Sequence, residues 1–179
     1  MKKLVLKLDT KSINGAIDEL NKYRSALRSK SEELVSRLLD EGIKVAYQHV
    51  PGRYSGYIEF TKEIPNKGTQ CVGLFIGRNT QTFVSRWVTK AGVQEADVNA
   101  LAMAEFGSGW LANVIWNISG VGQGTFPGQK HAMDQIWFWE DEDGTKHHSR
   151  GEAPTYPMYY ADMQMLAKID SIAKEIFSE

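Results

Sequence analysis

Three histidines and a run of acidic residues lie close together in the C-terminal half of the sequence. His131, His147 and His148 flank the run Asp141-Glu142-Asp143, and imidazole and carboxylate groups are side chains that bind zinc in proteins. Because adjacent residues of a strand point to opposite faces, His147 and His148 cannot both bind one ion without distortion. Surface positions on a hairpin are therefore favoured over a metal site, and a metal-dependent hydrolase is kept only as the alternative function.

No other arrangement of residue types predicts catalysis. The segment Asp141-Glu142-Asp143-Gly144 lacks the further spaced oxygen ligands and the closing glutamate of a calcium loop. The glycine-rich segment 120–128 does not have phosphate-binding spacing, and Phe106-Gly107-Ser108-Gly109 lacks the first glycine of a nucleophile elbow. We therefore predict a protein that is not an enzyme, with no catalytic residue, no cofactor and no metal ligand.

The composition is typical of a chain that folds as one domain, residues 1–179. Of its 179 residues, 42% are hydrophobic and 24% are charged, which is enough apolar material for a core without disulfides or metal. The formal net charge of -1, from 21 basic and 22 acidic side chains, argues against a broad nucleic-acid-binding surface. The lone Cys71 begins an apolar run that ends at Ile76, where a thiol usually acts as a small buried hydrophobe.

The N-terminal segment, Met1 to Asp9, does not have the pattern of a secretory signal. It has lysines at its start but no long apolar region and no small-residue cleavage pattern. Nowhere in the sequence do about 18 apolar residues run together, as a membrane-spanning helix requires. We therefore expect the chain to stay in the cytoplasm of the cell that makes it.

Apolar residues at helical spacing predict helices at both ends of the chain. They recur every three to four positions from Ile13 to Leu27 and again from Leu34 to Ala46. Ser31 is a cap candidate followed by acidic residues, so this region is either two helices or one bent helix that ends before Pro51. A closing helix is predicted from Met158 to Ile176.

Between the helices, aromatic and β-branched residues predict strands. Tyr54 to Glu63 and Thr69 to Arg78 flank the turn Pro65-Asn66-Lys67-Gly68, which predicts a β-hairpin. Thr80 to Thr89 is a predicted third strand, and residues 3–8 are suited to a short edge strand or arm. Short connections favour antiparallel pairing.

A second hairpin is predicted from Ile136 to Glu140 and from Thr145 to Ser149, because Asp143-Gly144 is a turn signal. Glu95 to Phe106 has the apolar spacing of a helix, with a strand at Met103 to Phe106 as the alternative. The expected fold class is α+β, with the N-terminal helical segments and the C-terminal helix packed on a mainly antiparallel sheet.

A long glycine-rich apolar loop is predicted at about residues 108–135. Its glycines remove the conformational restraint that a regular element needs, and a connection of this length tends to be functional or to order on a partner. A short helix from Gly109 to Asn117, packed on the core, is an equally weighted alternative.

Four groups of residues follow one another in a fixed order through this part of the sequence. They are Ala104-Glu105-Phe106-Gly107-Ser108-Gly109, then Gly124-Thr125-Phe126-Pro127-Gly128-Gln129, then Trp137-Phe138-Trp139 ahead of Asp143-Gly144, then Gly151-Glu152-Ala153-Pro154 with Pro157-Met158-Tyr159. In this order they resemble the tail-component family of long-tailed bacteriophages, the tail-completion or neck proteins. The resemblance covers about half of the chain by motif, and the apolar insert between Gly109 and Gly124 departs from it.

The resemblance implies a structural protein of the virion that joins the tail tube to the head connector. It implies a homo-oligomeric ring, a hexamer, whose neighbours are a connector or stopper protein and a tail terminator or tail tube protein. Genome DNA would pass through such a ring without specific binding, and no membrane partner is implied. The expected location is the tail or neck of the virion, after assembly in the host cytoplasm.

Large apolar side chains on the predicted loop and hairpin are the candidate interface, because aromatic residues carry much of the binding energy at protein contacts. The candidates are Trp110, Leu111, Ile115, Trp116, Phe126, Trp137 and Trp139. Trp137 and Trp139 share one face of their strand, which can instead face the core.

Overall fold

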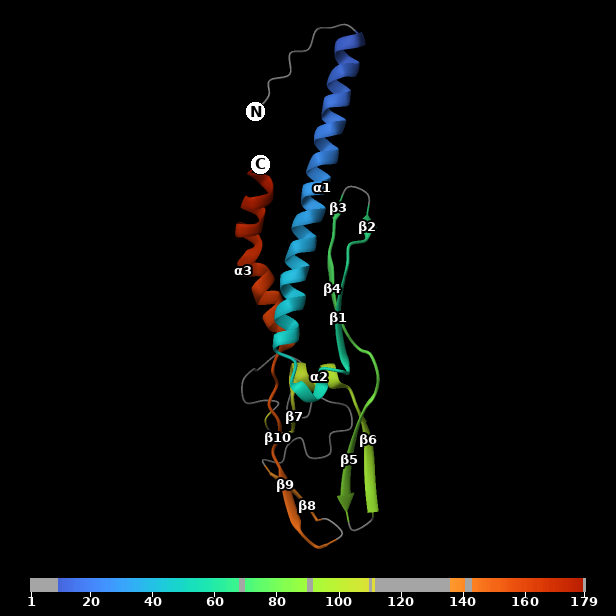
Figure 1. Cartoon of the computed structure of the whole chain (residues 1–179), viewed down its shortest axis with the longest axis vertical. Helices are drawn as coiled ribbons and strands as arrows, with labels where there is room; N and C mark the ends of the chain where they lie inside the picture. The colour runs from blue at the N-terminus through green and yellow to red at the C-terminus, as the bar shows by residue number, and fades with distance from the viewer. Residues whose placement is uncertain are drawn as a thin grey trace.

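The computed structural model describes residues 10–67, 70–89, 92–109, 111, 136–140 and 143–178. Within these ranges the chain is an α+β protein with helices packed on antiparallel strands, which confirms the predicted fold class. Figure 1 shows a long helix, α1, along the longest axis of the molecule, with α3 on one side of it and the β1–β4 hairpin on the other. The predicted edge strand at residues 3–8 lies outside the described residues.

The N-terminal helical region is one continuous helix, α1, from Thr10–Gln48. Of the two alternatives for this region, two helices is therefore wrong. Ser31 lies within the helix, and its hydroxyl donates to the carbonyl oxygen of Leu27 at 2.9 Å, one turn back. The helix ends before Pro51, as predicted, and a short 3₁₀ helix, η1 (Gly52–Tyr54), turns the chain toward the first strand.

The predicted first hairpin is present. Strand β1 (Ile58–Glu63) pairs antiparallel with β4 (Leu74–Asn79), and the short β2 (Asn66–Lys67) and β3 (Gln70–Cys71) pair near the turn. The hairpin lies against α1, where Lys62 Nζ reaches Asp40 Oδ2 at 2.6 Å and Ser36 Oγ at 2.8 Å.

The predicted third strand is β5 (Phe83–Thr89), and it pairs with β6 (Gly92–Val98). The prediction of helix from Glu95 is therefore wrong for its first residues, since Glu95 to Val98 belong to a strand. The helix α2 is shorter (Ala100–Phe106), because Asn99 caps it by accepting the backbone N–H of Ala102 at 2.9 Å. The strand alternative at Met103 to Phe106 is also wrong.

The second predicted hairpin is formed by β8 (Trp137–Glu140) and β9 (Lys146–Ser149). A further short pair joins β7 (Ser108–Gly109) to β10 (Gly151–Glu152). Each described strand pairs with one partner, so the strands form separate antiparallel ladders along the molecule.

The closing helix, α3 (Pro157–Phe177), runs antiparallel along the C-terminal half of α1. Met165 packs against Gly42, Arg37 pairs with Glu175, and Lys30 Nζ donates to the carbonyl oxygen of Ile176 at 2.8 Å. Below this helix pair lies a small core that joins α1, η1, β1, α2 and α3. It consists of Ala46, Tyr54, Ile58, Phe60, Ala100, Ala104 and Ala161.

The two long helices differ greatly in length. At about 1.5 Å per residue, the 39 residues of α1 extend about 58 Å and the 21 residues of α3 about 32 Å. Because α3 begins beside the C-terminal end of α1, it reaches only as far as Lys30. The first five turns of α1, from Thr10 to Leu27, therefore extend beyond α3 (Figure 1).

Candidate functional site

Most of the predicted interface residues lie outside the described part of the chain. Trp110, Ile115, Trp116 and Phe126 lie outside the described residues, as does nearly all of the predicted long loop. Leu111 is half-buried, and its backbone N–H donates to the carbonyl oxygen of Arg150 at 3.2 Å. Trp137 and Trp139 lie on β8 opposite Ser149 and His147, but only their backbone is described.

The histidines do not gather in the described part of the molecule. His147 is half-buried and His148 is exposed on β9, so the two side chains leave opposite faces, as alternation along a strand requires. His131 lies outside the described residues, as do Asp141 and Glu142. Within the described ranges, no group of three or more His, Cys, Asp or Glu side chains is arranged to hold a metal ion.

Two of the four residue groups that carry the resemblance, the first and the last, meet at one place, which we call the motif junction: residues 104–109, 151–154 and 157–159. The carbonyl oxygen of Ala104 accepts the backbone N–H groups of Thr155 and Tyr156 at 2.8 and 3.1 Å. Ser108 Oγ accepts the N–H of Glu152 at 3.0 Å, and β7 pairs with β10. These hydrogen bonds join the end of α2 to the start of α3.

Glycine is required at two positions of the motif junction. Gly107 and Gly151 have φ values of 69° and 92°, a region that side chains with a Cβ rarely adopt. A Cβ on Gly151 would overlap the carbonyl group of Ser108, and one on Gly107 would lie 2.8 Å from Pro154 Cδ. The two strands of the junction can therefore approach this closely only with glycine there.

Glu105 is the charged group at the centre of the motif junction. Its Oε2 accepts the N–H of Met158 at 2.8 Å and its Oε1 accepts the N–H of Tyr159 at 3.1 Å, so it caps the start of α3 from another element. Burial raises the pKa of Glu105, although the two backbone hydrogen bonds lower it in part. A helix start is also where a negative charge is favoured by the helix dipole.

Glu152 connects the motif junction to η1, the short 3₁₀ helix that follows α1. Its Oε2 accepts the hydroxyl of Tyr54 at 2.6 Å, and its Oε1 forms an ion pair with Arg53. Arg53 also lies 4.9 Å from the centre of the Tyr54 ring. Burial raises the pKa of Tyr54, and the charge of Arg53 lowers it in part. The carboxylate of Glu152 is thus held by two donors from one short 3₁₀ helix.

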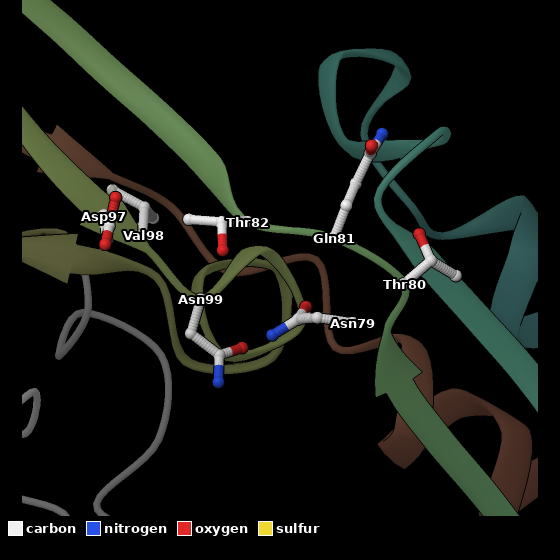
Figure 2. Close-up of a pocket in the computed structure, with 7 residues that line it drawn as sticks. All are labelled: Asn79, Thr80, Gln81, Thr82, Asp97, Val98 and Asn99. Carbon is white, nitrogen blue, oxygen red and sulfur yellow. The ribbon is translucent and has the colours of Figure 1, made fainter.

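A polar hollow of about 490 Å³ opens beside α2, between β4, β5 and β6 (Figure 2). The side-chain amides that line it are engaged in hydrogen bonds within the fold: Asn79 Oδ1 accepts the N–H of Leu101, and Asn99 Oδ1 accepts the N–H of Ala102. Thr80 and Gln81 both donate to the carbonyl oxygen of Gly56. We therefore assign these side chains to the connection between the two hairpins.

Two apolar stripes are exposed on the long helices. On the part of α1 that extends beyond α3, the side chains are 43% to 68% exposed, and we call them the arm stripe: Ile13, Ile17, Leu20, Tyr23 and Leu27. On α3 the side chains are 39% to 57% exposed, and we call them the α3 stripe: Met163, Leu166, Ile169 and Phe177. The helical spacing of the arm stripe predicted a buried face, and Leu166 and Ile169 were placed on the apolar face of the closing helix, whereas Met163 and Phe177 were not singled out. The unequal lengths of the two periodic segments were the signal that could have revealed the exposed stripes.

No family model, no curated protein and no solved structure matches this chain. Among the described helices, none combines the length and the apolar character needed to cross a membrane.

Proposed function

We propose that this chain is a structural protein of a long-tailed phage virion, which assembles at the head-to-tail junction and joins the tail to the head connector. The observation that carries the proposal is the motif junction. Four groups of residues resemble the tail-completion family in order and composition, and the first and last of them meet in space and hold the helices to one another. Motifs that meet in this way are easier to explain by a shared fold than by chance.

The chemistry of the motif junction supports a structural role. Its glycines permit close backbone contact, Glu105 caps a helix, and the carboxylate of Glu152 is held by Tyr54 and Arg53. Each of these groups satisfies a partner within the fold. An assembly protein needs such a rigid centre, because a subunit that is bound on several sides must hold its binding surfaces in fixed relative positions.

The exposed apolar stripes support assembly as well. Soluble monomeric proteins rarely expose large contiguous apolar patches, and those that do usually bind another protein or a membrane there. The arm stripe and the α3 stripe each run about 21 Å along their helices, at about 1.5 Å per residue. A subunit of a larger particle would bury such surfaces against its neighbours.

Labelling of virions tests the proposal directly. Phage particles that carry this gene would be purified and treated with a gold-labelled antibody raised against the full chain, and then viewed by negative-stain electron microscopy. We expect gold at the neck, between the head and the tail tube. Gold at the distal tail tip or on the capsid, or its absence from particles in which a tail tube antibody labels normally, would overturn the proposal.

A further inference from the structure

The arm stripe continues a face of α1 that is already an interface. Leu20, Leu27 and Leu34 are spaced at seven residues, so they lie on one side of the helix. In the C-terminal half of α1, this side packs against α3 of the same chain, where Gly42 meets Met165. Beyond Lys30 the same apolar side goes on for five more turns, but α3 has ended.

The α3 stripe lies beside the interface that α3 already makes. Ala161, Ile172 and Ile176 are buried, whereas Leu166 and Ile169 are exposed on the neighbouring side of the helix. The apolar surface of α3 is therefore wider than the side that α1 covers. The two stripes also match in length, since Ile13 to Leu27 and Met163 to Phe177 cover the same number of helical turns.

Charges beside the two stripes are complementary. Arg24 lies four residues after Leu20 and three before Leu27, and Arg28, which also pairs with Glu32 at 2.9 Å, follows one turn later. Two cations therefore border the arm stripe, against one carboxylate, Glu19, four residues before Tyr23. On α3, Asp162 and Asp170 lie four residues before and after Leu166, so two carboxylates border the α3 stripe, against one cation, Lys174, three residues before Phe177. The two arginines and the two aspartates are exposed. A parallel pairing of arm with arm would bring Arg beside Arg, whereas an antiparallel pairing of arm with α3 brings Arg beside Asp.

We infer that the arm stripe of one copy of this chain docks on the α3 stripe of a second copy. The contact is antiparallel, like the packing of α1 on α3 within one chain, and it places Arg24 and Arg28 beside Asp162 and Asp170. Each copy uses two different surfaces, so the contact is head-to-tail and can close into a ring. This inference rests on the proposed function only for the place where such a ring would act, since it follows from the surfaces of the chain itself.

Disulfide cross-linking tests which surfaces meet. In a Cys71→Ser background, one chain carries Leu20→Cys, a second carries Ile169→Cys, and a third carries both. The two new thiols of one chain lie about 25 Å apart along the helix axis, and a disulfide needs Cα atoms within about 7 Å, so any bond joins different copies. After mild oxidation of the full-length protein, the mixture of single variants should give dimers on a non-reducing gel, and the double variant should give a ladder.

Each single variant alone is the control for the symmetric alternative. Dimers formed by Leu20→Cys alone would show arm-to-arm pairing and would overturn the inference. A double variant without cross-links would also overturn it, whether the wild-type chain is monomeric or oligomeric by light scattering. In the oligomeric case the proposed function would stand, since the ring would close through other surfaces. If the cross-links formed but the antibody did not label the neck, the contact between copies would be supported and the proposed location in the virion would be wrong.

Charge reversal gives an independent test with its own rescue. Arg24→Glu with Arg28→Glu should shift the wild-type oligomer toward monomer in light scattering, and so should Asp162→Arg with Asp170→Arg. All four changes in one chain should restore the oligomer, because the charge pairs are re-formed with reversed sign. Leu166→Glu should also dissociate it, whereas Ser171→Glu, at an exposed position about 140° around α3 from Leu166, should leave it intact. The docking model would be contradicted if the chain with all four charge changes stayed monomeric, or if the two single glutamate substitutions on α3 had equal effects on the oligomer.

Discussion

The two halves of α1 have the same amphipathic pattern but different surroundings. In the C-terminal half, Leu39, Gly42 and Ala46 are buried between α3 on one side and the β1–β4 hairpin on the other. In the N-terminal half, Leu20 and Leu27 have the same spacing, yet they are 56% and 44% exposed. The difference arises because α3 is about half as long as α1.

Apolar residues at helical spacing therefore indicate that a helix face is covered, but they do not indicate whether the covering surface belongs to the same chain or to another. Burial of an apolar side chain is favourable whether the covering surface belongs to the same chain or to another copy. The two cases differ in what a substitution changes. A change in the covered half should lower the stability of the subunit, and a change in the arm stripe should alter association.

The largest expected effect is that of Leu39→Ala. Leu39 is only 5% exposed, so its truncation leaves a cavity and should lower the free energy of unfolding by about 2–5 kcal/mol. Leu20→Ala is the matched control and should change it by less than about 0.5 kcal/mol. Urea denaturation monitored by circular dichroism would measure both, at protein concentrations low enough for the transition to be independent of concentration. Equal losses would mean that the arm stripe is part of the subunit core.

The fold was predictable where local patterns decide it. The period of the apolar residues predicted α1 and α3, and turn residues predicted the β1–β4 and β8–β9 hairpins, because these signals act between near neighbours in the chain. The sequence left two helices or one bent helix open at the cap candidate Ser31, because a serine hydroxyl can cap a helix or bond to the preceding turn within one, as it does here. The helix predicted from Glu95 failed because pairing of β6 with β5 outweighed local helical spacing.

The site was predictable only as a set of motifs. Nothing in the sequence says that Glu105 would cap a helix that begins at Pro157, because that hydrogen bond joins residues that are distant in the chain. The exposed stripes were also missed, since the spacing of Leu20 and Leu166 is that of a buried face. A comparison of the two periodic segments would have shown that the N-terminal one is much longer than the C-terminal one, so that part of its apolar face extends beyond the C-terminal helix.

A smaller effect is expected where the hairpin meets the covered half of α1. Gly73 lies so close to α1 that an added Cβ would overlap Val35 Cγ1 and lie 2.9 Å from Leu39 Cδ1. Val35 is β-branched and cannot easily turn away, so Gly73→Ala should lower the free energy of unfolding by about 1–3 kcal/mol. In a chain that already carries Val35→Ala, the added Gly73→Ala should lower the free energy of unfolding by much less, because the overlapping methyl group has been removed. An unchanged stability of Gly73→Ala would show that the hairpin is not held against the helix.

The smallest effect concerns Glu105, which fixes where α3 begins and hence how much of α1 it can cover. Glu105→Ala leaves the N–H groups of Met158 and Tyr159 without their acceptor and should lower the free energy of unfolding by about 1 kcal/mol at neutral pH. Circular dichroism during urea denaturation measures this loss. Thr155→Ala, which removes a hydroxyl hydrogen bond to Ala104 of 3.3 Å, is a milder control at the same junction.

The pH dependence of Glu105 sharpens this test. Burial raises its pKa above the ordinary value of 4.5, so the folded chain holds this proton more tightly than the unfolded chain. The resulting stabilisation is present below pH 4.5 and is lost as the pH rises through the raised pKa. Glu105→Gln cannot titrate, so the stability of the wild type minus that of this variant should fall as the pH rises above 4.5. If that difference rose with pH instead, the backbone hydrogen bonds to the carboxylate would outweigh its burial, and the charged form would be what holds the start of α3 in place.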